Sequence, residues 1–297
     1  MNEIKIQIKM LMQGFKDHYI VATSIFVFLL SIFITVAFVI EDKYQANALL
    51  KYSDEDVGSN FSVASPLEGI GALGGINLGG NSVDPIDYSI AVIKSRVFLE
   101  QLLEKPDIKR NLVAYKNYDK EGKTLSFNTD IYNPETSEWI KDINFLKIHN
   151  DFYIKNLNLT KNRSNGFLNI SFNHVSPEFS KYFIDLIVEE LNKAISIVDI
   201  NNSEKRLELL IERSNQNTKR EVRDALSRLI ENEFKKIAYS KTKAEYMLET
   251  IDPAFIPNKA YYPNRLLIIL LGFVIGLISS TLYVFIKNSS EEKDIDF

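Results

Sequence analysis

The chain has 297 residues, of which 45% are hydrophobic, and its formal net charge is -4 at pH 7. It contains no cysteine, which excludes disulfides, thiol catalysis and cysteine-ligated metal sites. A nucleic-acid partner is also excluded, because phosphate backbones are bound by clusters of Lys and Arg and no such cluster stands out here.

Two long uncharged runs lie near the ends of the chain, at 20–40 and 266–286. Each would rise about 31 Å as a helix at ~1.5 Å per residue, which matches a hydrocarbon core of about 30 Å. Arg265 and Lys287 bracket the second run. A cleaved signal peptide is the alternative for the first run, but the apolar region of such a peptide is only about 7 to 15 residues long. The sequence therefore predicts two transmembrane helices.

The orientation of these spans follows from the lysines beside the first one. Three lysines precede it and two closely follow it: Lys5, Lys9 and Lys16 before, Lys43 and Lys51 after. Basic residues favour the cytoplasmic side of a span. We therefore predict cytoplasmic tails at 1–19 and 287–297, with the middle of the chain across the membrane.

The first part of that middle region, 41–176, has mixed strand and helix signals. Residues 44–52 read as a strand, and residues 85–104 read as one helix because Asp84-Pro85 is a capping residue followed by proline. Further signals predict a short helix beginning at Asn133-Pro134 and strands at 145–159 and 167–174. The sequence thus predicts an α/β base.

Three patterns in the base resemble ligand motifs without completing them. Residues 69–74 form a GxGxxG inside the glycine-rich stretch 58–80, but no strand precedes it, so an apolar loop that packs on a neighbouring subunit or near the membrane is the better interpretation. Gly122-Lys123-Thr124 lacks the second glycine of a phosphate loop. Neither His149 nor His174 has metal-ligand spacing. We predict no cofactor, no metal and no catalytic residue.

Residues 177–249 form the next region, where neither proline nor glycine interrupts a series of apolar stripes after Pro177. One helix over this range would climb about 110 Å at ~1.5 Å per residue. The chain that follows, 250–263, extends only about 50 Å at ~3.5 Å per residue and must return to the membrane. The arm must therefore fold back, and the polar gap at 214–219 is the predicted turn.

Four residues mark this predicted arm tip: Asn215, Asn217, Thr218 and Glu221. Thr218 and Glu221 have the spacing of a capping box, in which the hydroxyl caps a new helix and the carboxylate three residues later bonds back. The flanking helices should pack antiparallel.

A proline-rich return segment, 250–265, leads into the second span. Pro253, Pro257 and Pro263 fix φ and remove backbone donors, which favours a stiff extended connector, although a helix stop followed by a linker explains the first proline equally well. Within the span, Gly272, Gly276 and Ser280 form a small face that permits close helix packing. The alternative is that glycine is simply common in membrane helices.

This arrangement resembles the Wzz-type polysaccharide co-polymerases over essentially the whole chain. The resemblance is carried by two terminal spans, the strand-helix base, the helical arm, the glycine-rich loop, the segment IDPAFIP at 251–257 and YPNR at 262–265 before a glycine-bearing span. It implies an α+β periplasmic domain between two transmembrane helices of the bacterial inner membrane. It also implies contact with membrane lipid.

The resemblance implies a non-catalytic function. Such a protein would form a ring-shaped homo-oligomer and set the modal chain length of a lipid-linked, O-antigen-type polysaccharide made by a Wzy-type polymerase. Two alternatives stay open. One is the membrane adaptor of a capsule or exopolysaccharide tyrosine kinase, and the other is a two-span periplasmic sensor, for which the ten polar residues after the second span would be a poor output domain.

Overall fold

The computed structural model describes residues 18–53, 84–216 and 219–295. The glycine-rich stretch at 58–80 lies outside them. Backbone contacts divide the chain into two units, one made of Met1–Lys43 with Ala260–Phe297 and the other of Tyr44–Lys259.

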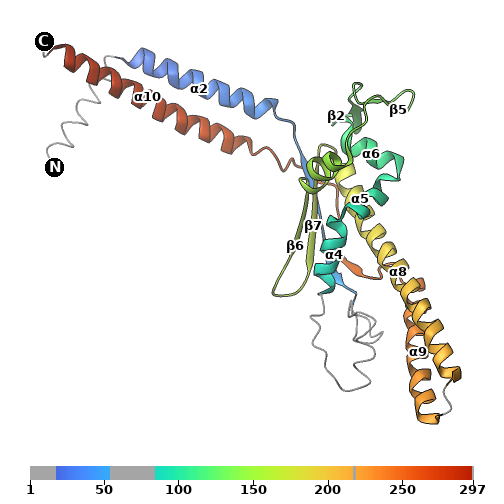
Figure 1. The fold of residues 1–297 in the computed structure, drawn as a ribbon. Helices are drawn as coiled ribbons and strands as arrows, with labels where there is room; N and C mark the ends of the chain where they lie inside the picture. Colours follow the sequence, from blue (N-terminus) through green and yellow to red (C-terminus); the bar gives the residue numbers. More distant parts are fainter. Residues whose placement is uncertain (1–17, 54–83, 217–218, 296–297) are drawn as a thin grey trace, which may run out of the picture. The chain divides into compact units, whose positions relative to one another are not determined.

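The first unit is a pair of long helices, α2 (Tyr19–Val39) and α10 (Arg265–Ile295), which lie side by side (Figure 1). Both are long and apolar enough to cross a membrane, the second over Arg265–Asn288. This confirms the two predicted apolar helices near the ends of the chain. The helix α10 continues beyond residue 286 into the predicted tail.

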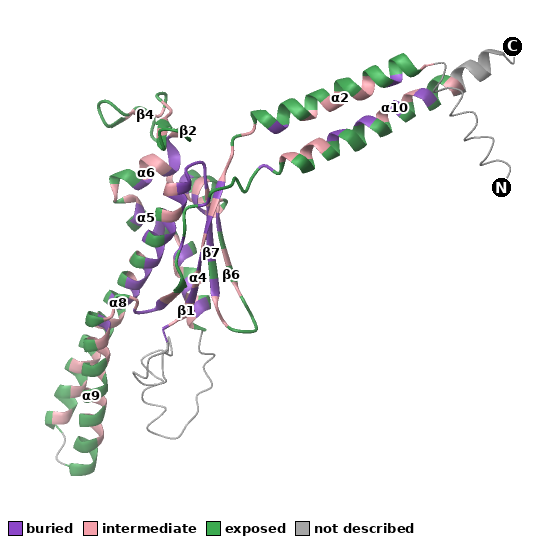
Figure 2. Cartoon of the chain, turned by 180° about the vertical axis from the view of Figure 1, so that it is seen from behind, coloured by how far each residue is buried: buried purple, intermediate pink, exposed green. Residues whose placement is uncertain are grey.

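The second unit is built on a four-stranded antiparallel sheet of order β6-β7-β1-β8. The strands are β1 (Tyr44–Tyr52), β6 (Leu157–Lys161), β7 (Leu168–His174) and β8 (Leu248–Asp252). Burial alternates along β1, and along β7 except at the buried Ser171, because successive side chains point to opposite faces. The buried face packs against the helix α4 (Pro85–Lys94) and against α8 (Pro177–Gln216). The helices α5 (Arg96–Leu103) and α6 (Pro106–Val113) contribute to the same core, and Figure 2 colours the buried residues purple.

The helix predicted at 85–104 is two helices, so that prediction was wrong in its length. Ser95 adopts an extended conformation, with ψ of 153°, and its hydroxyl accepts a hydrogen bond from the Phe98 amide at 3.2 Å. The chain therefore ends one helix and caps the next at a single residue. The break lets Ile93, Phe98 and Leu102 all face the core.

The short helix predicted from Asn133-Pro134 is instead a hairpin of β4 (Tyr132–Asn133) and β5 (Glu138–Trp139). The Asn133 side chain accepts hydrogen bonds from the amides of Glu135 and Thr136, which makes an Asx turn rather than a helix cap. Ser137 takes a positive φ of 58°, and the rings of Tyr132 and Trp139 then meet across the strands at 5.2 Å. A second hairpin joins β2 (Tyr115–Asp119) to β3 (Thr124–Phe127).

The strand predicted at 145–159 is also mostly wrong. Residues Phe145–Lys147 form α7 and Ile148–Ile154 form a π-helix, η1, so the strand begins only at Leu157. Asn144 caps the first turn by accepting from the Leu146 amide at 2.8 Å. Tyr153 is completely buried and donates its hydroxyl to the Ile93 carbonyl at 2.7 Å, which fixes this helical turn against α4.

The arm is an antiparallel pair made of α8 and α9 (Arg220–Thr242), which confirms the predicted reversal. Its helical part ends at Thr242, not at 249, because Leu248 already begins the edge strand β8. The predicted return segment also begins too early, because residues 250–252 belong to the same strand and pair with β1. The fold is thus the predicted α+β base with an antiparallel helical arm between two apolar helices.

Candidate functional site

The helix pair α2 and α10 contains the predicted packing residues. A Cβ added to Gly272 would come within 2.6 Å of the Phe33 Cγ atom, and one added to Gly276 within 2.9 Å of the Phe26 Cδ2 atom. Such distances are shorter than carbon atoms tolerate, so only glycine fits at positions 272 and 276 against these two rings. Ser280, one turn further, is 4% exposed. The structure therefore places all three small residues on the face of α10 that contacts α2.

A polar clamp closes the same pair at the end where the chain leaves the two helices. The guanidinium of Arg265 donates to the Asp42 carboxylate at 2.8 Å and lies 5.0 Å from the centre of the Phe38 ring. The Lys43 amide donates to the Tyr262 carbonyl at 2.8 Å. A polar hollow of about 430 Å³ opens beside this clamp and is lined by Asp42, Ala260, Tyr261, Pro263, Asn264 and Arg265.

The three predicted prolines lie in different surroundings. Pro263 is buried and lines that hollow, whereas Pro257 is buried and Pro253 exposed in the other unit. No helix or strand is present in residues 253–260. The two bulky side chains between Pro253 and Pro257 are largely exposed, with Phe255 at 58% and Ile256 at 46%. The stiffness of this connector stays a prediction.

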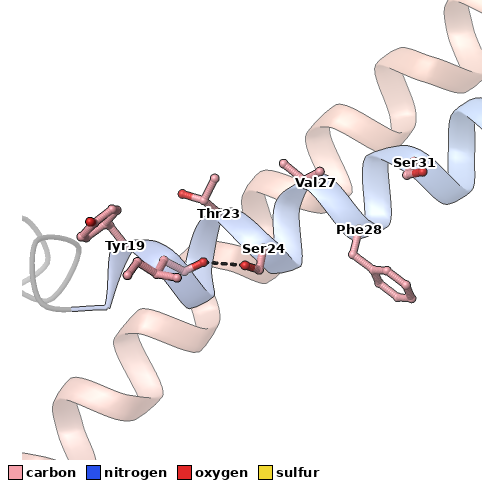
Figure 3. A pocket seen from close by; sticks show the side chains of 7 residues that line it. Tyr19, Thr23, Ser24, Val27, Phe28 and Ser31 are labelled. Carbon is pink, nitrogen blue, oxygen red and sulfur yellow. Dashed lines mark hydrogen bonds between the residues drawn. The ribbon is translucent and has the colours of Figure 1, made fainter.

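A second hollow, of about 660 Å³, follows the outer face of α2 (Figure 3). Its hydroxyl groups come from Tyr19, Thr23, Ser24 and Ser31. The Ser24 hydroxyl donates to the Ile20 carbonyl of its own helix at 2.7 Å, and the Thr35 hydroxyl donates to the Ser31 carbonyl at 2.9 Å. Bonding of this kind satisfies a hydroxyl inside a bilayer without a ligand.

At the arm tip, Asn215 and Glu221 are exposed, and Asn217 and Thr218 lie outside the described residues. The N-cap of α9 is Lys219, with φ of -75° and no hydrogen bond from its side chain. The helix therefore begins one residue later than the predicted capping box requires, and Glu221 is the second helical residue instead of the third.

The sequence did not indicate which residue joins the arm to the base. Asn192, on α8, is 1% exposed. Its amide nitrogen donates to the Leu248 carbonyl at 2.9 Å, and its Oδ1 atom accepts from the amides of Met247 and Leu248 at 2.7 and 2.8 Å. One side chain thus holds the start of β8. The available signal was a lone asparagine between Leu191 and Ile195 on the apolar stripe.

Further along the arm, polar pairs connect α8 to α9. The Arg206 guanidinium binds both carboxylate oxygens of Glu233, at 2.9 and 3.1 Å. The Ser196 hydroxyl donates to the Ser240 carbonyl at 2.7 Å. Near the base, the Tyr246 hydroxyl donates to Asp199 at 2.7 Å, and burial together with this bond raises the pKa of Tyr246 far above its ordinary value. That phenol stays neutral and acts as a structural donor.

The two histidines considered as ligands both bond to the backbone. His174 accepts from the Ser176 amide at 3.1 Å through Nδ1, and its Nε2 lies 3.0 Å from the Asn111 carbonyl. His149 Nε2 lies 2.9 Å from the Lys94 carbonyl. In the part of the chain that the structure describes, no cluster of three or more His, Asp or Glu residues could hold a metal ion.

The comparisons with known proteins give structural likenesses only. No family model matches the sequence. No curated protein matches it either. Among solved structures, a full-length bacterial polysaccharide co-polymerase is similar, with 10% identity and a TM-score of 0.40, over 95% of this chain and 97% of that one. A fragment of WzzB, a polysaccharide co-polymerase from Salmonella Typhimurium, is similar with 14% identity and a TM-score of 0.28, over 75% of this chain and 100% of that one.

Proposed function

We propose that this protein is a non-catalytic regulator that sets the modal chain length of a lipid-linked surface polysaccharide of the O-antigen type. It would do so in the bacterial inner membrane, with its α+β domain in the periplasm, beside a Wzy-type polymerase. The observation that carries the proposal is the architecture: a paired first and last helix, both able to span a bilayer, bracket one α+β base with an antiparallel helical arm.

Oligomeric assembly is part of the same proposal. The arm exposes bulky apolar side chains along both helices, including Ile197, Val198, Leu209 and Phe234, each between 49% and 58% exposed. Burying such side chains is favourable by about 25 cal/mol per Å² of apolar surface. A ring of identical chains standing side by side would bury them. The mass of the protein in nanodiscs should therefore exceed that of one chain, and a monomer at all concentrations would contradict the ring.

The function is tested in a deletion strain. Surface polysaccharide from cells that lack this chain should lose its modal length distribution on a gel, and the intact gene should restore it. The double variant Gly272→Leu and Gly276→Leu should insert into the membrane and fail to restore it, because leucine cannot fit against Phe33 and Phe26. Loss of all polymer, instead of a changed length, would point to the adaptor of a polysaccharide-specific kinase.

A further inference from the structure

The sheet of the base has one face that the core does not use. Alternation along β1, β6 and β7 sends every second side chain to this face. Seven of these side chains are polar and uncharged, and we refer to them as the amide face: Gln45, Asn47, Asn158, Thr160, Asn169, Ser171 and Asn173. Five of the seven are carboxamides, and Leu49, opposite Asn169, is an apolar neighbour on the same face.

The strand register places these groups in rows across the sheet. Gln45 lies opposite Asn173, and Asn169 lies opposite Thr160. Such side chains recur about every 6.8 Å along a strand and about every 4.8 Å between strands. Asn158, Thr160 and Asn169 are exposed, Gln45, Asn47 and Asn173 are half-buried, and Ser171 is buried among them. The result is a regular array of hydrogen-bonding groups.

Charge is held at the border of this array. Lys51 and Glu249 neutralise each other at one end of the sheet, with 3.4 Å between the ammonium and the carboxylate. Lys161 points to the opposite face, where its ammonium lies 2.8 Å from Asp84 and 3.0 Å from Asp87. Lys51 is on the same face of β1, and its pairing with Glu249 keeps this charge beside the seven residues and not among them. A protein partner would find little apolar surface there, whereas the cores of protein interfaces are largely apolar.

One atom of the array has an unmet hydrogen bond. The Oδ1 atom of Asn173 is buried and accepts no hydrogen bond from the residues that the structure describes. Buried acceptors are nearly always paired in folded proteins. Because this atom is itself inaccessible, it adds to the polar character of the array and is not a contact point for a ligand.

We infer that the amide face binds an uncharged stretch of glycan through the hydroxyl groups of its sugars. Carboxamides both donate and accept, as sugar hydroxyls do, so each residue of the array can pair with a hydroxyl in either direction. This inference rests on the proposed function, since it makes the growing polysaccharide the ligand, and it assigns the contact to the base sheet instead of the arm. A repeating ligand on a repeating array would bind weakly at each sugar and more tightly as the chain grows.

The test uses the full chain in nanodiscs and a labelled probe: polysaccharide released by mild acid from the source strain and fractionated by length. The variant Asn158→Asp with Asn169→Asp keeps the size of both side chains and removes their NH₂ donors. Its affinity should fall about tenfold or more, because each lost hydrogen bond contributes about 1 kcal/mol and about 1.4 kcal/mol is tenfold. The matched control is Asn201→Asp with Asn232→Asp, which adds the same charge at exposed positions of the arm. The control should bind as the parent chain does.

Equal affinity of the two double variants would overturn the inference. So would a change in the mass of the assembly without a change in affinity, because the face would then contact a second copy of the chain. The deletion strain separates the two proposals. An unchanged length distribution after deletion rejects the proposed function. If deletion does change the length distribution but the amide-face variant binds glycan normally, only this binding site is rejected.

Discussion

The base and the arm are stabilised in different ways, although the helix α8 belongs to both. From Phe179 to Ile195 that helix contributes a continuous series of buried apolar side chains to the core. Beyond Ser196, the only buried residue that the structure describes in α8 is Ser203, and in α9 it is Ser240. Half-buried stripes and polar pairs hold the rest of the arm together. The base therefore folds around a core of its own, while the arm depends on the contact between α8 and α9.

The largest effect is expected in the core of the base. Phe183 is completely buried, with its ring centre 4.5 Å from that of Phe172 and 5.4 Å from that of Phe179. Phe183→Ala should lower the free energy of unfolding by about 3 to 5 kcal/mol, the range typical of a buried Phe replaced by Ala. Urea unfolding of the full chain in nanodiscs, followed by circular dichroism, measures this loss.

The matched control for that variant lies in the arm. Phe234 on α9 is 54% exposed, so the removal of its ring in Phe234→Ala leaves no closed cavity. Its effect should stay below about 1 kcal/mol. Similar losses at the two positions would mean that the arm is packed as tightly as the base, and the contrast would fail.

An intermediate effect is expected where the two regions join. Asn192→Ala removes three hydrogen bonds to the backbone of Met247 and Leu248 and leaves those buried groups unpaired. Stability should fall by about 2 to 3 kcal/mol, because unsatisfied buried groups keep their desolvation penalty. Hydrogen exchange at the Met247 and Leu248 amides should accelerate. Asn201→Ala, at an exposed position of the same helix, should leave both readouts unchanged, and slow exchange in Asn192→Ala would refute the role of this side chain.

The smallest effect is expected along the seam of the arm. Glu233→Gln removes the negative charge from the ion pair with Arg206. The side chain of Arg206 is 43% exposed and that of Glu233 is 19% exposed. The loss should be about 0.5 to 1 kcal/mol, and it should shrink at ~1 M salt, where the screening length is about 3 Å. Glu231→Gln, which breaks an exposed pair with Lys235 on the same helix, should have a smaller effect. A loss that does not depend on salt would show that packing, not charge, matters at Glu233.

The parts of the fold that sequence predicts well are those with one dominant signal. The helices α2 and α10 were predicted because each contains an uncharged run long enough to cross the thickness of a bilayer. The arm reversal followed from a polar gap and from the short chain available for return. The strand β1 was predicted with the bounds that the structure has, Tyr44–Tyr52.

The predictions that failed depended on a single local contact. Asn133 before a proline fits a helix cap and an Asx turn equally well, and the ring pair of Tyr132 and Trp139 decides between them. Ser95 looks like any residue inside an apolar helical pattern until its hydroxyl caps Phe98. Neither choice can be read from periodicity. The amide face was likewise hidden, because it appears only when the register of β1, β6 and β7 is known.

The clamp between Asp42 and Arg265 has a mechanical consequence. Together with the Lys43 to Tyr262 bond, it fastens the exit of the first helix to the entrance of the second. Because both contacts lie at one end of the helix pair, a displacement of either helix relative to the other would break the ion pair and the backbone hydrogen bond together.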